Sequence, residues 1–394
     1  MTPALVVIDG EHYPPVVRDA IAGLPYEVIG AWRAGGTEKL RGPADYGVPL
    51  LAALEDGFGD AKVVVDLSDE PVLGPRERML LASRVLAAGL RYEGADFHFE
   101  APELASFPLP SLAVIGTGKR VGKTAVTAHV ARLLARDRDV VVVAMGRGGP
   151  PEPQVAIVRP TLESLLELSR AGQHAASDHL EIAALTGVVT IGCRRAGGGL
   201  AGAVTTSNVL QGAALAAERE PDVVIFDGSG AAVPPVDVDA RILVIGRGHD
   251  PLAYLNPYRV LISDAVVVLG DADAGAVREL KKIPVVSADL RLRPVLPLHG
   301  RRVAVFTTGP AATEDLDADV VSVSRNLANR PQLSEDLLRT DADVYLVEIK
   351  AAAIDLVAEA ALRRGAEVVF AENEVVSSDL DDLIQRLVPA GARA

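Results

Sequence analysis

The residues best suited to chemistry lie in one short run, Gly116-Thr117-Gly118-Lys119-Arg120-Val121-Gly122-Lys123-Thr124. This run falls between an expected strand and an expected helix, which is the setting of a phosphate-binding loop. Backbone N–H groups of such a turn form a concave anion site, the final lysine reaches the outer phosphates, and the threonine hydroxyl coordinates Mg²⁺. The common pattern G-x-x-x-x-G-K-[ST] has glycine where this chain has threonine, so the match is imperfect. We therefore predict a nucleotide site rather than an empty glycine-rich turn, with contacts from Thr117, Gly118, Lys119, Arg120, Val121, Gly122, Lys123, Thr124 and Ala125.

An acidic residue is expected at the end of a neighbouring strand. The segment Val223-Val224-Ile225-Phe226-Asp227-Gly228-Ser229-Gly230 places Asp227 after four apolar residues. A carboxylate there can hold Mg²⁺ directly or through water, together with Thr124. The alternative is an Asp that caps a strand-to-loop turn. We predict Mg²⁺ ligands at Thr124 and Asp227, and catalytic roles for Lys123, Asp227 and Arg147.

Two arginine–glycine segments predict a second, anionic ligand. Arg147 lies in Met145-Gly146-Arg147-Gly148-Gly149, directly after the apolar run from Val140 to Ala144, and Arg194 and Arg195 precede a run of three glycines. Ligands of open α/β sheets bind beyond the carboxyl ends of the strands, and arginine binds phosphate in a bidentate manner. Each segment alone would equally suit a surface ion pair. Together, in an acidic protein, they indicate a highly anionic small substrate.

Several other candidates carry weaker signals. His12, in Asp9-Gly10-Glu11-His12-Tyr13, follows the first expected strand and is a candidate substrate contact, although a plain turn is equally compatible. The single cysteine, Cys193, has no base beside it and is interpreted as a packing residue. For a further group near expected strand ends or on helices a structural role is favoured: His174, His179, Glu181, Asn326, Arg330 and Lys350.

Composition excludes several classes of protein. The 394 residues carry 39 Lys and Arg against 53 Asp and Glu, a formal net charge of -14. Such a balance argues against nucleic acid or an anionic membrane as a partner. One cysteine allows no intrachain disulfide, the start resembles no secretory signal, and no apolar run is long enough to span a bilayer. We expect a cytoplasmic protein.

The elements that position these residues form an α/β fold. Short Val/Ile/Leu runs alternate with Ala/Leu-rich helical patterns, which is typical of mostly parallel sheets covered by helices. Two proline-rich stretches, 101–110 and 291–300, are interpreted as boundaries. We predict a central P-loop ATP-binding domain (109–298) flanked by smaller N-terminal (1–108) and C-terminal (299–394) α/β domains. Residues 351–364 are expected to form one of the C-terminal helices.

The loop G-T-x-x-x-V-G-K-T and the strand ending D-G-x-G resemble the dethiobiotin-synthetase-like branch of P-loop enzymes. Over nearly its full length, the chain resembles the cyclic 2,3-diphosphoglycerate synthetase family. The segments that carry this resemblance are DGEHYPPVVRDA (9–20), DLSDEPVLGPRER (66–78), YEGADFHFE (92–100), GTGKRVGKTA (116–125), AMGRGGPPEP (144–153), IGCRRAGGGLAG (191–202) and VEIKAAAIDLVAE (347–359).

The resemblance implies an ATP-dependent ligase that closes 2,3-diphosphoglycerate into a cyclic phosphoanhydride and releases ADP and phosphate. The ATP side would be served by Lys123, Thr124 and Asp227, and the substrate phosphates by Arg147, Arg194 and Arg195. A homodimer is common among relatives of the branch. Two alternatives stay open: another P-loop ligase acting on a small phosphorylated or carboxylic acid, and a nucleotide-switched binding protein.

Overall fold

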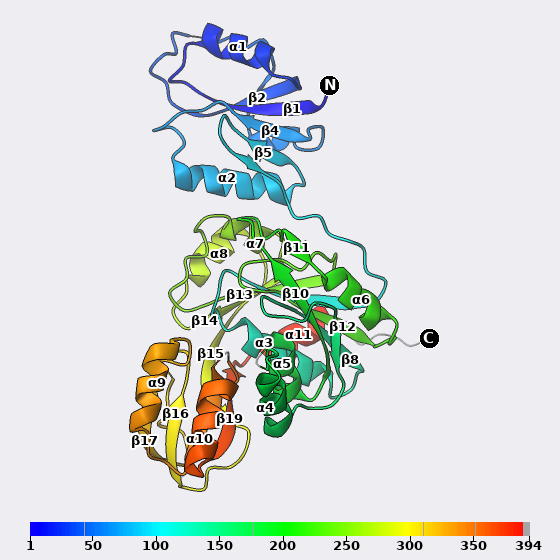
Figure 1. The fold of residues 1–394 in the computed structure, drawn as a ribbon. Coiled ribbons are helices and arrows are strands. Elements are labelled where there is room, and N and C mark those ends of the chain that lie inside the picture. Colours follow the sequence, from blue (N-terminus) through cyan, green and yellow to red (C-terminus); the bar gives the residue numbers. More distant parts are fainter. Residues whose placement is uncertain (43, 176, 310, 351, 389–394) are drawn as a thin grey trace.

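The computed structural model describes residues 1–42, 44–175, 177–309, 311–350 and 352–388. These residues form three α/β units that follow one another along the chain, as Figure 1 shows: the N-terminal unit at one end, the phosphate-loop unit in the middle and the C-terminal unit at the other end. The predicted fold class, a central P-loop unit flanked by α/β units, is confirmed.

The N-terminal unit is a small, mainly parallel sheet in the order β3-β2-β1-β4-β5-β6. Its helix α2 (Pro75–Ala87) packs against helix α7 (Asn256–Leu261) of the central unit, where Leu255 and Tyr258 enter the same apolar core as Leu81 and Val85. The elements are β1 (Pro3–Asp9), α1 (Pro14–Gly23), β2 (Glu27–Gly35), β3 (Leu50–Leu51), η1 (Leu54–Gly57), β4 (Val63–Asp66), α2 (Pro75–Ala87), β5 (Arg91–Glu93) and β6 (His98–Phe99).

The central unit is built on parallel strands in the order β10-β8-β12-β7-β13-β14-β15, with β9 and β11 antiparallel to β10. Strands β7, β8, β12 and β14 are buried along their whole length because apolar cores cover both faces of the sheet. Its strands are β7 (Ser111–Gly116), β8 (Val140–Gly146), β9 (Gln154–Ala156), β10 (Val189–Ala196), β11 (Thr206–Ser207), β12 (Val223–Asp227), β13 (Ala240–Ile245), β14 (Ala265–Leu269) and β15 (Val285–Pro294). Its helices are α3 (Lys123–Leu134), α4 (Leu162–Arg170), α5 (Asp178–Thr186), α6 (Val209–Ala217), α7 (Asn256–Leu261) and α8 (Ala274–Leu280).

The C-terminal unit continues the same sheet with the order β15-β19-β18-β16-β17. Its elements are β16 (Arg302–Phe306), β17 (Asp319–Ser324), α9 (Arg330–Arg339), β18 (Val344–Glu348), a π-helix η2 (Ala353–Ala358), α10 (Glu359–Arg364), β19 (Glu367–Val376) and α11 (Leu380–Leu387). The helix expected from residue 351 therefore begins as a π-helix at Ala353, and residue 351 itself lies outside the described residues.

The proline-rich stretch 291–300, which was interpreted as a boundary, begins inside a strand, because β15 runs on to Pro294. The first half of β15 pairs in parallel with β14, and residues 289–294 pair antiparallel with β19. Arg291–Pro294 is thus strand because each residue has a partner in β19, and the only proline in it occupies the last strand position.

The last helix returns to the central unit. In Figure 1 α11 lies beside α3, and Leu380, Leu383 and Ile384 share an apolar core with Val126 and Val130 of α3. The domain division at residue 299 stays a prediction, and α11 packs across it. Within the described residues, no helix is long and apolar enough to cross a membrane.

Candidate active site

The phosphate loop connects β7 to α3 and is shaped by its neighbours. Gly122 has a φ of 81°, and a Cβ built on it would lie 2.2 Å from Leu269 Cδ1, so this position requires glycine. Arg120 also has a positive φ, 63°, which is uncommon for a residue with a side chain and recurs at functional turns. The loop is anchored by Thr117, whose N–H donates to the carbonyl of Val244 on β13 over 3.2 Å.

The lysine of the loop is paired with Asp227, the acid that was predicted as a Mg²⁺ ligand. Lys123 Nζ donates to Asp227 Oδ1 over 2.7 Å, and Thr127 Oγ1 donates to the same oxygen over 2.6 Å. Burial raises the pKa of Asp227, and the charge of Lys123 opposes that rise. The second oxygen, Oδ2, is buried without a hydrogen-bond partner. An unpartnered carboxylate oxygen at the end of β12 fits a cation such as Mg²⁺, which takes few protein ligands and completes its shell with phosphate oxygens and water.

Four basic side chains gather around the loop. The charge of Arg147 is the main influence that lowers the pKa of Lys119, with burial and Arg120 acting in the same direction. Burial and then Arg147 lower the pKa of Arg195, which the carboxylate of Asp178 partly opposes. These shifts show that the cations repel one another in the ligand-free chain. A polyanion bound among them would remove that repulsion, which is the electrostatic signature of an anion site.

The other two predicted substrate residues, Arg194 and His12, are not part of this basic cluster. The side chain of Arg194 is exposed, and its backbone N–H donates to Asn208 Oδ1 over 2.6 Å. His12 lies in the N-terminal unit, where its ring is 2.8 Å from Asp9 Oδ1 and 3.4 Å from Asp69 Oδ2. The structure therefore groups Arg147 and Arg195 with the phosphate loop, whereas the contacts of His12 lie within its own unit.

Arg195 has a structural task as well. Its guanidinium donates to the carbonyl of Gly197 over 2.5 Å and to the carbonyl of Ser229 over 2.8 Å. Ser229 belongs to the loop that follows Asp227, so Arg195 ties the β10 loop to the β12 loop. Its Nε is buried without a partner.

The first turn of α5 is a part of the site that the sequence did not reveal. A Cβ on Gly146, the residue before Arg147, would lie 3.4 Å from Asp178 Oδ2. A Cβ on Gly192 of β10 would lie 2.3 Å from His179 Nδ1. The helix therefore docks directly on two strand glycines. Burial lowers the pKa of His179 to about 4, so its ring is neutral at physiological pH and packs as an uncharged group.

The same helix carries a buried ion pair to the C-terminal unit. Glu181 on α5 accepts a hydrogen bond from Lys350 Nζ, which follows β18. Burial raises the pKa of Glu181 to about 7, and Lys350 opposes the rise. For Lys350 the balance is reversed: burial is the largest influence and acts to lower its pKa, but the charge and hydrogen bond of Glu181 together with the charges of Glu348 and Asp178 raise it. We expected a structural role for Glu181 and Lys350, but the sequence did not predict that they pair with each other and join the central unit to the C-terminal unit.

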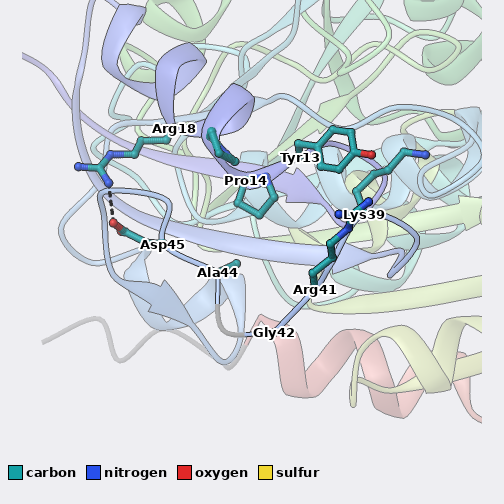
Figure 2. A pocket seen from close by; sticks show the side chains of 9 residues that line it. Tyr13, Pro14, Arg18, Lys39, Arg41, Gly42, Ala44 and Asp45 are labelled. Carbon is teal, nitrogen blue, oxygen red and sulfur yellow. Dashed lines mark hydrogen bonds and ion pairs between the residues drawn. The ribbon is translucent and has the colours of Figure 1, made fainter.

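A second basic cavity lies in the N-terminal unit and is drawn in Figure 2. Its volume is about 410 Å³, and Lys39 and Arg41 lie 5.8 and 6.0 Å from the ring centroid of Tyr13. Arg18 on its wall already pairs with Asp45 over 2.5 Å. The helix that opens onto it begins with Pro14-Pro15, which offer no N–H donors. This cavity is thus less suited to phosphate than the loop in the central unit.

The loop contains a required glycine and leads into the N-terminus of a helix, and its lysine forms an ion pair with a buried Asp at the end of a strand. These features define a P-loop nucleotide-binding enzyme. Three models of one family match the chain: the N-terminal domain of cyclic 2,3-diphosphoglycerate synthetase over residues 3–100, its P-loop domain over 111–291 and its C-terminal domain over 294–374. The particular family is therefore clear: this chain belongs to the cyclic 2,3-diphosphoglycerate synthetases.

Full-length relatives support this assignment. The cyclic 2,3-diphosphoglycerate synthetase of Rubrobacter xylanophilus is 47% identical over 99% of this chain and 98% of that protein. The synthetase of Thermococcus kodakarensis is 41% identical with the same coverage, and that of Methanothermus fervidus is 36% identical over 98% of this chain and 96% of that protein. Among solved structures, LpxK from Aquifex aeolicus in complex with ATP aligns with a TM-score of 0.45 at 16% identity, over 73% of this chain and 90% of that one, which is too distant to bear on function.

Proposed function

We propose that this chain joins the two phosphates of 2,3-diphosphoglycerate into a cyclic phosphoanhydride at the expense of ATP. The observation that carries the proposal is the position of Arg147 and Arg195 beside a phosphate loop that already carries Lys119 and Arg120. One nucleotide and its Mg²⁺ would not need so many cations, because the loop already supplies Lys123 and backbone N–H groups. A small second substrate with two phosphates and a carboxylate accounts for the rest.

The reaction can be written in two balanced steps. An oxygen of one substrate phosphate attacks the γ-phosphorus of ATP, the bond to the β-phosphate oxygen breaks, and ADP leaves. An oxygen of the other substrate phosphate then attacks the phosphorus nearest the glycerate carbon of that new diphosphate. The outer phosphate departs as inorganic phosphate, and the ring closes. Both steps depend on positioning and charge neutralisation more than on covalent help from the protein.

The side chains of this chain would divide the work. Lys123 leaves Asp227 Oδ1, 2.7 Å away, and binds the outer phosphates of ATP. Asp227 and Thr124 would hold Mg²⁺, which neutralises charge on the β- and γ-phosphates when it is bound. Arg147 would stabilise the transferring phosphoryl group, and with Arg194 and Arg195 it would align the substrate phosphates. A substrate role for His12 stays a prediction.

The setting of the enzyme is also part of the proposal. We place it in the cytoplasm, where ATP and phosphorylated glycerates are available and where a lone buried thiol such as Cys193 stays reduced. Its partners would be small anions and a second copy of the chain, and neither nucleic acid nor a membrane is expected at a net charge of -14. Light scattering on the purified protein measures the dimer directly.

The test is phosphate release from ATP and Mg²⁺, with and without 2,3-diphosphoglycerate, followed by ³¹P NMR of the products. Release that depends on the acid, together with a cyclic phosphoanhydride resonance, supports the proposal. Acid-dependent release without a cyclic product points to a ligase with a different acceptor. Phosphate release at the same rate with and without 2,3-diphosphoglycerate contradicts the proposal and favours a nucleotide-switched binding protein.

A further inference from the structure

Lys350 is one of the residues by which the C-terminal unit contacts the central unit. Lys350 follows β18, and its ammonium crosses to Glu181 on α5 of the central unit. The Glu181 side chain is 8% exposed, so this contact is largely shielded from water. A buried carboxylate of this kind is stable only while a partner compensates its charge.

The acid nearest to Lys350 in the sequence is not available to it. Glu348 accepts hydrogen bonds from the N–H and Oγ1 of Thr308, over 2.8 and 3.0 Å, and from Asn373 Nδ2 over 2.7 Å. These contacts occupy Glu348 within the C-terminal unit. The hydrogen-bonding partner of Lys350 therefore lies in the other unit, and the pair is one of several ion pairs that join the two units.

The contact continues toward the arginine loop. Glu181 and Asp178 lie in the first turn of α5, and Asp178 Oδ2 approaches the backbone of Gly146, directly before Arg147. That turn has little freedom of its own, because His179 rests on Gly192 and its Nδ1 lies 2.9 Å from Ser177 Oγ. A shift of this turn would displace the loop that carries Arg147.

We infer that Lys350 is a positioning residue for the anionic substrate: through Glu181 it holds the first turn of α5 against the Arg147 loop. The inference rests on the proposed function. Nucleotide binding is expected to depend little on Lys350, because the phosphate loop continues directly from β7 and is tied to β13 by the hydrogen bond from Thr117 N–H to the carbonyl of Val244. Loss of Lys350 should therefore weaken binding of 2,3-diphosphoglycerate and leave binding of ADP nearly unchanged.

The experiment compares Lys350→Met and Lys350→Arg with the wild-type enzyme by calorimetry with 2,3-diphosphoglycerate and, separately, with ADP and Mg²⁺. We expect Lys350→Met to raise the Kd for 2,3-diphosphoglycerate by about tenfold or more, since small displacements of positioning groups have effects of that size or larger. The Kd for ADP should stay within about twofold, and Lys350→Arg should restore most of the lost affinity. The matched control is Arg330→Met, which removes an exposed ion pair with Asp355 inside the C-terminal unit and should change neither Kd.

A double variant separates positioning from stability. Lys350→Met leaves Glu181 buried without its partner, and Glu181→Gln in the same chain removes that charge, so the double variant should melt near the wild-type temperature. If it melts normally and still binds 2,3-diphosphoglycerate weakly, Lys350 positions the site. If affinity returns together with the melting temperature, or if Lys350→Met affects both ligands equally, the inference is overturned. A wild-type enzyme that binds ADP but not 2,3-diphosphoglycerate would instead contradict the proposed function itself.

Discussion

Replacing Arg147 with glutamine should weaken binding of the anionic substrate and, at the same time, slightly stabilise the ligand-free protein. Both effects follow from its position: Arg147 is exposed and repels Lys119 and Arg195 when no anion is present. Most substitutions destabilise a protein, so a substitution that stabilises and also inactivates is diagnostic of a residue placed for function.

The two effects differ in size. Exposed charge pairs are worth about 0.2 to 1 kcal/mol, so relief of repulsion should raise the unfolding free energy by about 0.5 kcal/mol. A hydrogen bond to a charged group is worth about 1.5 to 3 kcal/mol, so its loss should raise the Kd for 2,3-diphosphoglycerate roughly 10- to 100-fold. The loss of affinity should shrink as salt concentration rises, because salt screens exposed charges.

Urea unfolding without ligands and calorimetric titration at two salt concentrations measure these quantities. The control is Arg219→Gln, an exposed arginine just beyond α6 and outside the basic cluster, which should alter neither result. A less stable Arg147→Gln protein with unchanged affinity would refute the reasoning, because it would mean that Arg147 serves the fold.

Three further predictions concern buried positions. Asp227→Asn should leave Lys123 buried without its ionic partner and destabilise the fold by about 3 to 5 kcal/mol in thermal unfolding. The same change should abolish Mg²⁺-dependent phosphate release, and normal release would exclude Asp227 from the site. Gly192→Ala places a methyl group 2.3 Å from a ring nitrogen of α5 and should cost about 1 to 3 kcal/mol in urea unfolding, whereas Gly23→Ala, with nothing within 4 Å, should cost far less. Burial raises the pKa of Glu181 from 4.5 to about 7, so between those values the folded chain holds a proton that the unfolded chain has lost, and stability from this group declines as pH rises. Glu181→Gln should remove that decline, on the order of 3 kcal/mol, from unfolding measured between pH 4.5 and 7, and equal slopes for the two proteins would contradict it.

The parts of the site that are local in sequence could be predicted from it. The phosphate loop is a continuous run, and Asp227 follows an unbroken apolar strand, so residue types alone located both. The pairing of Lys123 with Asp227 follows from the rule that parallel strands meet ligands at their carboxyl ends.

Other parts depend on contacts between distant segments. Strand β10 was not expected, because Thr-Ile-Gly-Cys-Arg-Arg-Ala interrupts its apolar run with glycine and charge. The ion pair of Glu181 with Lys350 joins residues far apart in the chain, and nothing local signals it. Two glycines in buried strands, Gly146 and Gly192, could have indicated where α5 packs. A side chain at either position would contact the helix.

The return of α11 to the central unit sets the order in which the molecule can be completed during synthesis. Leu380, Leu383 and Ile384 fill the same apolar core as α3, the helix that begins at the phosphate loop. A ribosome that has made residues 1–374 has produced every strand of the nucleotide site, yet one side of α3 still faces water. The emerging chain therefore carries an exposed apolar surface on α3 until α11 has left the exit tunnel.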